Sequence, residues 1–412
     1  MPSKPAVVIY RYSLLPPSET FILGQAESLQ RFTPYYVGSH VRKGGLLTPK
    51  ERTLVVNRGG SIGWAREVFY KLAGLVPYKL AGFTPTFVKP VQKLNPVLIH
   101  AHFGIEGTLA LPLRRRLNVP LLVTYHGFEE LIADEFAQSS DFNHRVVYLR
   151  RRDVLKREAQ LFIAVSNYCK ENLLKQGFPS NKIIVHHIGI DTNLFQPDPA
   201  VAREPIVLFV ARLVEKKGCE YLIRAMSKVQ AVRPDVELVV IGDGELRPFL
   251  EELAKEKLQR YRFVGVQPPE SVRAWMNRAK VFSVPSIVAK SGDAEGFGMV
   301  FAEAQAMGLP VVSFATGAIN ESVAHGEVGF LAAERDWEKL AQYILLLFEE
   351  DNLWNRFSEF GQSRVRTLFD LKKQTSALED IYEQVLRDFQ TRREDSGDTN
   401  KRALLNSETI RR

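Results

Sequence analysis

Short runs of apolar residues alternate with longer amphipathic stretches along most of this chain. The runs are about four to six residues long, and most show no alternation between apolar and polar positions. Strands of this kind are buried on both faces, which is typical of parallel sheets covered by helices. We therefore predict strands at residues 6–10, 97–101, 120–125, 161–164 and 182–186, and again at 205–210, 236–241, 261–264, 281–285 and 310–313.

The stretches between these runs carry apolar residues at helical spacing, as at 219–232, 246–256 and 301–307. A repeated order of strand and then helix predicts doubly wound α/β domains of the Rossmann-like type.

Proline and polar residues around 195–205 interrupt this pattern and predict a linker between two domains. The first domain then spans residues 1–198 and the second spans 199–370. Residues 371–390 predict a further helix that packs on one of the domains, and the polar, charged residues 391–412 predict a disordered tail.

Composition narrows the class of protein. With 45% hydrophobic and 25% charged residues, the chain has an ordinary globular composition. Its two cysteines, Cys169 and Cys219, are too few for a disulfide scaffold or a cysteine-rich zinc site. No apolar run approaches the roughly 20 residues that span a bilayer. We therefore expect a cytoplasmic protein that is at most peripheral on the inner face of the membrane.

Charge is unevenly distributed. Residues 1–200 contain 25 Lys and Arg against 15 Asp and Glu, a net charge of +10. Residues 201–412 contain 30 Lys and Arg against 32 Asp and Glu. A basic half suits nucleic acid, anionic lipid or a phosphorylated substrate, or is simply a solvated surface. Its arginine runs are short and lack interleaved aromatic residues, so we expect no nucleic-acid partner. Residues 62–83 predict either an amphipathic segment on an anionic membrane surface or a helical hairpin packed on its own domain.

The most informative stretch is residues 286–331, where a glycine-rich loop follows a predicted strand. Gly296 and Gly298 allow a ligand to approach the backbone, and the free N–H groups at the start of the following helix favour phosphate. Glu295 lies in the loop and Glu303 lies on the first turns of the helix. We therefore expect both carboxylates to face the same crevice.

Residues 295–303 (EGFGMVFAE) resemble the E-x7-E signature of retaining glycosyltransferases of family 4, which have the GT-B fold. Residues 209–218 (FVARLVEKKG) resemble a strand-to-helix element of that family, with Ala211 where glycine is commoner. The resemblance implies that Arg212 and Lys217 bind the donor pyrophosphate. This role is physically sound, because two fixed cations neutralise the charge that builds on a departing nucleotide diphosphate.

The same resemblance assigns further donor contacts. It places Glu295 at the donor sugar and Glu303 at the ribose hydroxyls, and residues 263–265 (FVG) resemble a segment that lies against the nucleobase. The implied donor-binding residues are Arg212, Lys217, Gly298, Met299, Val300, Glu303 and Val264. Taken singly, each motif also suits an ordinary turn or surface charge, and it is their shared order that favours the site.

Two histidine motifs in the first half resemble the same family. Residues 124–127 (TYHG) resemble a loop whose histidine reaches the reaction centre, which implies a catalytic role for His126 beside Glu295. Residues 99–104 (IHAHFG) resemble a strand end that carries His102. The alternative for either histidine is a packing or capping role.

Residues 18–21 (SETF) resemble the corresponding loop of bacterial exopolysaccharide glycosyltransferases of the colanic-acid type. Ser18, Glu19 and Thr20 are therefore candidates for the acceptor loop. Ser18 and Glu19 also suit simple capping of a helix over residues 20–29. Residues 317–321 (GAINE) depart from the family's G-G-I-P-E, and His187 replaces a common asparagine.

The resemblance implies a GT-B fold, with two Rossmann-like domains facing across a cleft. The first domain would bind the acceptor and the second the nucleotide sugar, with the helix at 371–390 packing back towards the first. The expected reaction transfers a hexosyl group from a UDP- or GDP-sugar to a glycan or lipid-linked oligosaccharide with retention, in cell-surface polysaccharide synthesis. The alternatives are a non-catalytic GT-B module that binds nucleotide sugar and, less favoured, a GT-B epimerase. A Rossmann dehydrogenase would need G-x-G-x-x-G after the first strand, and residues 10–24 have no such run.

We expect no cofactor and no catalytic metal. Nucleotide-sugar enzymes that use a divalent cation hold it with D-x-D, and the nearest match here is Asp293-Ala294-Glu295. The resemblance requires Glu295 at the donor sugar instead. Arg212, Lys217 and the helix start already supply positive charge to the phosphates.

Overall fold

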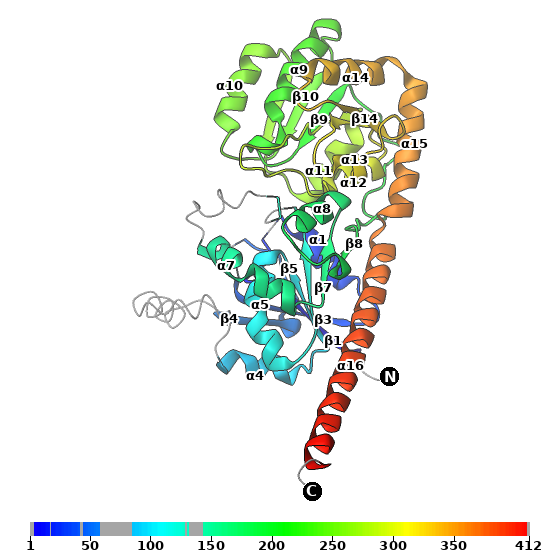
Figure 1. Ribbon diagram of the computed structural model, residues 1–412. Coiled ribbons are helices and arrows are strands. Elements are labelled where there is room, and N and C mark those ends of the chain that lie inside the picture. Colours follow the sequence, from blue (N-terminus) through cyan, green and yellow to red (C-terminus); the bar gives the residue numbers. More distant parts are fainter. Residues whose placement is uncertain are drawn as a thin grey trace.

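The computed structural model describes residues 4–16, 18–41, 44–57, 85–127, 130–131 and 143–409. Two parallel β-sheets, each covered by helices, form two domains that lie one above the other in Figure 1. This arrangement confirms the prediction of two doubly wound α/β domains. The predicted division at residue 198 lies between the last strand of the first sheet and the first strand of the second.

The first sheet has eight described strands in the order β2-β3-β1-β5-β6-β7-β8, with β4 also paired to β3. The order reverses between β1 and β5, so a crevice is expected beyond the carboxyl ends of these two strands. The strands are β1 (Ala6–Tyr10), β2 (Ser13–Leu14), β3 (Thr33–Val41), β4 (Thr53–Asn57), β5 (Leu98–His102), β6 (Leu121–Tyr125), β7 (Leu161–Ala164) and β8 (Ile183–Val185). Its helices are α1 (Thr20–Glu27), α4 (Pro85–Lys93), α5 (Gly104–Leu117), α7 (Asn143–Glu158) and α8 (Asn167–Lys175).

The second sheet has six described strands in the order β11-β10-β9-β12-β13-β14, which reverses between β9 and β12. The strands are β9 (Ile206–Val210), β10 (Glu237–Ile241), β11 (Tyr261–Gly265), β12 (Val281–Phe282), β13 (Val311–Phe314) and β14 (Gly329–Ala332). Its helices are α9 (Cys219–Val232), α10 (Arg247–Lys257), α11 (Pro269–Arg278), α12 (Met299–Ala306), α13 (Ile319–Ser322), α14 (Trp337–Glu349) and α15 (Asp351–Leu368).

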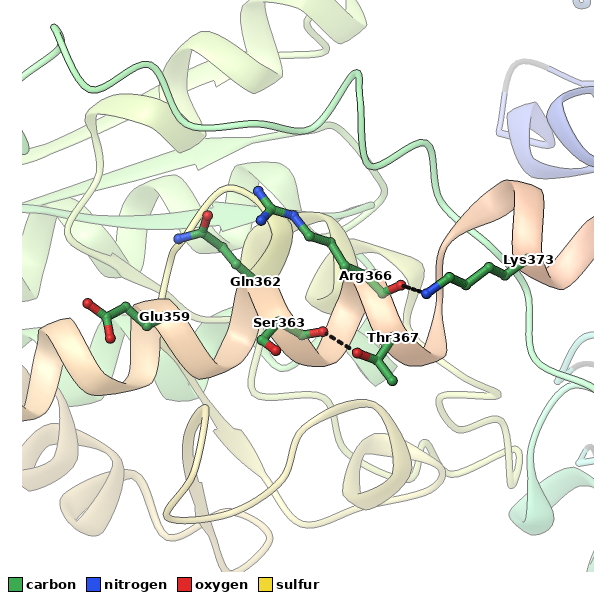
Figure 2. A pocket seen from close by; sticks show the side chains of 6 residues that line it. All are labelled: Glu359, Gln362, Ser363, Arg366, Thr367 and Lys373. Carbon is green, nitrogen blue, oxygen red and sulfur yellow. Dashed lines mark hydrogen bonds between the residues drawn. The ribbon is translucent and has the colours of Figure 1, made fainter.

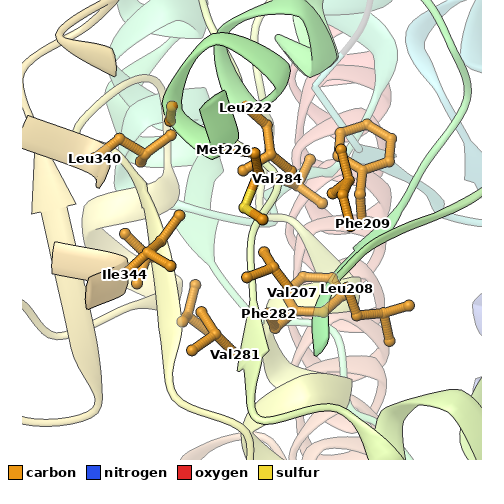
Figure 3. Packing of buried hydrophobic residues seen from close by; sticks show 14 of the residues in the cluster. Val207, Leu208, Phe209, Leu222, Met226, Val281, Phe282, Val284, Leu340 and Ile344 are labelled. Atoms are coloured by element: carbon orange, nitrogen blue, oxygen red, sulfur yellow. The ribbon is translucent and has the colours of Figure 1, made fainter. Parts of the chain in front are cut away.

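The core of the second domain explains its uninterrupted apolar strands. Val207 and Phe209 on β9 are fully buried, and Leu222 of α9 and Ile344 of α14 belong to the same cluster (Figure 3). Because helices cover both faces of β9, neither set of its alternating side chains meets water.

Helix α16 (Leu371–Thr409) leaves the second domain and runs along the first (Figure 1). The backbone N–H groups of Gln30 and Arg31 donate to Glu379 Oε1 over 2.8 and 2.6 Å. Tyr382 Oη lies 2.6 Å from Nδ1 of His100 on β5. These buried contacts attach α16 to the first sheet.

Where α16 begins, the chain makes its second crossing between the domains. The first crossing runs from β8 to β9, and the two meet at Ile190. The Ile190 N–H donates to the Phe369 carbonyl, and the Leu371 N–H donates to the Ile190 carbonyl, each over 2.8 Å. This pair of hydrogen bonds is called the Ile190 bridge below.

Helix α16 continues through Thr409, so the structure has a helix over residues 391–409, where the sequence predicts a disordered tail. This segment has no proline and only Gly397 as a strong helix breaker, while lysine, arginine, glutamate, alanine and leucine favour a helix.

Candidate functional site

Two cations lie beyond the carboxyl end of β9, at the point where the second sheet reverses its order. Arg212 is exposed, and within the described residues its side chain has no hydrogen-bond or ion-pair partner. Lys217 ends a short 3-10 helix (Glu215–Lys217), and its ammonium group forms an ion pair with the largely buried Glu295 carboxylate. The predicted pyrophosphate ligand and the predicted catalytic carboxylate are therefore in direct contact.

A second ion pair lies beside the first. Lys216 Nζ donates to Asp293 Oδ1 over 2.8 Å and to the Ala294 carbonyl over 3.3 Å. Burial alone would raise the pKa of Glu295, but the ammonium groups of Lys217 and Lys216 lower it below its usual value. Glu295 is therefore a carboxylate at neutral pH.

The start of α12 presents backbone N–H groups to the same region. Gly298 is the N-cap residue with a φ of +79°, a left-handed conformation that favours glycine. Met299 and Val300 form the first turn and pack towards different domains, Met299 against the first and Val300 against the second. Further along the helix, burial raises the pKa of Glu303 to about 7.

On the side of the first domain, His126 follows β6 and lies among aromatic rings. The ring centroids of Phe21 and Phe103 lie 4.9 and 4.8 Å from that of His126. His102 Nδ1 is 3.1 Å from His126 Nε2, and the two imidazoles are stacked. Burial lowers the pKa of both histidines well below the usual value, so both are neutral.

A buried charge cluster lies beyond β1, where the first sheet reverses its order. Arg11 Nε donates to Glu19 Oε2 over 2.9 Å, and its Nη1 lies 2.7 Å from Glu106 Oε1. Glu19 occupies the N-cap position of α1, but its side chain makes no capping hydrogen bond. Its carboxylate pairs with Arg11 instead. Ser18 and Thr20 are exposed, at the edge of this cluster.

The two halves of the site meet through two glycines. A Cβ added to Gly127 would lie 2.4 Å from Gly296 Cα, and one added to Gly296 would lie 2.5 Å from Gly127 Cα. His126 and Glu295 directly precede these glycines in the sequence, so the contact brings the two predicted catalytic residues to one interface. Cys169 adds a hydrogen bond from its thiol to the Gly296 carbonyl, 3.5 Å between sulfur and oxygen.

Glu321 forms a further contact between the domains. Its carboxylate accepts hydrogen bonds from the backbone N–H groups of Asn167 and Tyr168 over 2.8 and 2.9 Å, and from Asn167 Nδ2 over 2.9 Å. A negative charge at a helix N-terminus is favourable, so Glu321 of the second domain caps α8 of the first. We call this contact the Glu321 cap.

Val264 lies two strands away from Arg212 on the same edge of the second sheet. Its carbonyl accepts a hydrogen bond from Gln267 Nε2 over 2.7 Å. The loops after β10 and β11 are joined by the Gly242 N–H, which donates to the Gly265 carbonyl over 2.9 Å. The structure thus lines the predicted donor residues along one edge, whereas Ser18 and Thr20 lie on the other domain.

Some residues of this region were not predicted from the sequence. Arg11 and Glu106 are single charged residues at a strand end and at a helix start, and that placement was the only available signal. Glu321 lies in the segment 317–321 that departs from the family's pattern, and its carboxylate contacts the other domain. Among the described residues, no group of three histidine, cysteine, aspartate or glutamate side chains is arranged to hold a metal ion.

A polar pocket of about 320 Å³ lies elsewhere, at the corner between α15 and α16 (Figure 2). Within it, Lys373 Nζ donates to the Arg366 carbonyl over 2.9 Å. It shares none of the residues described above.

Comparison with known families agrees with this geometry. The model of "Glycosyl transferases group 1" matches residues 191–364, and that of "Glycosyltransferase Family 4" matches residues 47–194. The group 1 match includes all six described strands of the second sheet, and the family 4 match includes β4 to β8 of the first. The fold is that of the GT-B glycosyltransferases, and the two halves of the chain are similar to the family 4 and group 1 models respectively.

Proteins similar in sequence include two that are named as biosynthesis glycosyltransferases. The chain is 33% identical over 252 residues to the amylovoran biosynthesis glycosyltransferase AmsK of Erwinia amylovora, covering 60% of each chain. It is 32% identical over 259 residues to the putative colanic acid biosynthesis glycosyltransferase WcaL of Escherichia coli K12, covering 61% of each. The matched region thus spans about three fifths of these relatives.

Solved structures support the fold over nearly the whole chain. The sucrose-phosphate synthase of Thermosynechococcus elongatus superposes with a TM-score of 0.72 at 21% identity, covering 94% of this chain and 100% of that one. The Anabaena protein HepE, in complex with UDP and glucose, gives a TM-score of 0.70 at 20% identity, covering 93% and 100%. In the described part of the chain, no helix combines the length and apolar character needed to cross a membrane.

Proposed function

We propose that this protein is a retaining glycosyltransferase that moves a hexosyl group from a nucleotide diphosphate sugar to a sugar hydroxyl. One observation carries the proposal: the exposed Arg212, the Lys217–Glu295 pair and the start of α12 converge where the second sheet reverses its order. Cations and free backbone N–H groups are what a diphosphate requires, and open α/β sheets bind ligands at this point.

The related proteins support the class of donor and the pathway. HepE is known in complex with UDP and glucose, and two similar proteins are named for exopolysaccharide synthesis. For this chain we infer a UDP- or GDP-sugar as donor. The acceptor is inferred to be a glycan or lipid-linked oligosaccharide of a cell-surface polysaccharide.

The arrangement suits a reaction without an enzymatic nucleophile. Glu295 is held by Lys217, and its proposed role is to bind the donor sugar. The bond from the anomeric carbon to the phosphate oxygen breaks as the bond to the acceptor oxygen forms on the same face. The acceptor proton passes to the departing phosphate, whose charge Arg212 and Lys217 stabilise. Proton NMR of the first product formed should show the anomeric configuration of the donor; an inverted product would contradict this mechanism.

A screen of nucleotide sugars by thermal shift tests the donor. A ligand present at a hundred times its dissociation constant stabilises the native state by about 2.7 kcal/mol if it binds only that state. UDP-sugars and GDP-sugars should be compared with the free nucleotides. A stabilising donor must then be incubated with lipid-linked acceptors: transfer supports an enzyme, whereas binding without transfer to any acceptor supports a non-catalytic module.

We further propose that catalysis needs no metal ion. Lys216 occupies Asp293, the carboxylate that a D-x-D-like site would use, at a distance of 2.8 Å. A divalent cation there would meet the charges of Lys216 and Lys217. Transfer should therefore survive dialysis against EDTA; its complete loss, with recovery on adding Mg²⁺ or Mn²⁺, would make Asp293 a metal ligand instead.

A further inference from the structure

The hydrogen-bonding capacity of His126 is divided unequally between its two ring nitrogens. Nε2 lies 3.1 Å from His102 Nδ1. Nδ1 is buried and has no partner among the described residues. An unpartnered buried nitrogen is costly in a folded protein, so Nδ1 marks a place where a ligand could complete the bonding.

A neutral imidazole carries a hydrogen on only one of its nitrogens. Burial and the nearby Arg11 guanidinium keep His126 neutral, so its tautomer and not its charge determines what Nδ1 offers a ligand. Whichever role Nε2 takes towards His102, Nδ1 must take the opposite one. If His102 carries its hydrogen on Nδ1, His126 Nε2 accepts and His126 Nδ1 donates, so the contact couples the tautomers of the two rings.

His102 is itself held firmly. The guanidinium Nη1 of Arg11 donates to the His102 carbonyl over 3.0 Å, and the N–H of Phe103 donates to the Thr124 carbonyl over 2.7 Å. Phe103 has a φ of +77°, which bulky residues rarely adopt, and its ring lies against Arg11 and His126. Unfavourable backbone conformations of this kind persist where the surrounding structure enforces them, often at functional sites.

We propose that His102 is a positioning residue that fixes a single tautomer of His126 and so presents Nδ1 to a sugar hydroxyl in the crevice. The identity of that hydroxyl rests on the proposed glycosyltransferase function. The tautomer does not, and it is measurable in the free protein.

Two substitutions separate hydrogen bonding from ring packing. His102→Phe keeps an aromatic ring but removes the bond to Nε2. His102→Asn loses the ring but keeps a polar atom close to the position of Nδ1. The full chain, labelled with ¹⁵N-histidine, should be compared by NMR in the wild-type form and in both variants, with His126→Gln used to assign the His126 signals.

The wild-type protein and H102N should each show one protonated and one unprotonated His126 nitrogen. H102F should show the averaged signals of a tautomer mixture. An unchanged His126 spectrum in a folded H102F would overturn the proposal. If H102F fails to fold, His102→Leu takes its place, because it too removes the bond.

Turnover provides the second readout, using the donor that the nucleotide-sugar screen identifies. H102F should lower kcat at least tenfold with KM changed less than threefold, and H102N should restore most of the loss. Equal loss in both variants would show that only ring packing matters and would overturn the proposal. If no nucleotide sugar binds, the proposed function fails while the NMR result still tests the tautomer.

Discussion

At the residue scale, we propose two alternating roles for Lys217. In the free protein it neutralises Glu295, and with a donor bound its ammonium group is proposed to face the pyrophosphate. An ion pair of this kind keeps two charges compensated until a ligand arrives. We propose Arg212 as the second cation of the site, since it is exposed and has no side-chain partner among the described residues.

Lys217→Ala should lower kcat about 100-fold or more, because the lost contact acts on charge that is greatest in the transition state. Arg212→Ala should act in the same direction. Steady-state turnover with the identified donor measures both effects. Lys255→Ala, in a side chain 71% exposed on α10, is the matched control and should leave turnover unchanged. Turnover of K217A close to that of the wild type would contradict the pyrophosphate assignment.

Glu303 should make stability depend on pH. Its pKa is about 7 when folded and about 4.5 when unfolded, so between these values the unfolded carboxyl ionises while the folded one keeps its proton. The folded state therefore loses stability as pH rises from 4.5 to 7. The difference in Tm between Glu303→Gln and the wild type should grow in favour of the variant from pH 5 to pH 8. The exposed control Glu252→Gln should show no change of this Tm difference with pH. If the Tm difference of E303Q is also constant with pH, the raised pKa of Glu303 is contradicted.

Sequence reasoning found the residues that belong to continuous motifs. Glu295 and Lys217 lie in short motifs and were predicted, and the structure pairs them. Arg11 and the role of Glu321 depend on partners far away in the sequence. Glu321, for example, binds the backbone of a residue 154 positions away. Their type alone did not distinguish them from surface charges.

At the element scale, the loop before α12 and α12 itself contact both domains. Phe297 and Ala302 pack in the hydrophobic cluster of the first domain, whereas Phe301 packs in that of the second. The segment that carries Glu295 therefore also contacts both domains. A ligand that moves this loop must change how the domains meet.

Gly296→Ala tests this contact. The added Cβ would lie 2.5 Å from backbone atoms of the facing loop, which cannot rotate away, so the loops must separate. We expect transfer to fall sharply and stability to fall by roughly 1–3 kcal/mol, a typical cost of overpacking. Gly24→Ala is the control, since its nearest neighbour lies 3.9 Å away and alanine favours a helix. Wild-type transfer by G296A would show that the loops need not touch.

Removing the charge of the Glu321 cap should loosen α8. In Glu321→Gln a single amide oxygen replaces a carboxylate that accepts three hydrogen bonds. The amides of Asn167 and Tyr168 should then exchange faster with deuterium, because their acceptor is weaker. Glu171→Gln, an exposed change on α8 itself, is the control. Equal deuterium exchange of these amides in the two variants would contradict a stabilising role of the Glu321 cap.

Secondary structure was predicted best where strands are buried on both faces, as for β1, β7 and β9. Strand β3 was missed, because Pro34, Gly38 and His40 interrupt its apolar pattern. It is a strand because its neighbours β1 and β4 pair with it, which no local pattern reveals. Strand β14 is short and begins at Gly329, and it depends on β13 in the same way.

At the scale of the whole molecule, the first half carries the net positive charge that an anionic membrane would attract. The amphipathic segment predicted at residues 62–83 lies outside the described residues, so its contribution stays a prediction. The full chain should float with vesicles of anionic lipid at low salt and be released at high salt. Vesicles of neutral lipid are the control, and failure to bind anionic vesicles at low salt would contradict the membrane hypothesis.

The Ile190 bridge limits the ways in which the two domains can move. A chain that crossed once would leave them free to swivel, but here two crossings are fastened to each other by backbone hydrogen bonds. Two crossings that are joined side by side resist twisting and sliding of the domains more than they resist bending. The two domains should therefore move apart by a hinge motion, with the Ile190 bridge at the hinge. A single protease cut in either crossing would leave the two halves bound, since the other crossing still holds them.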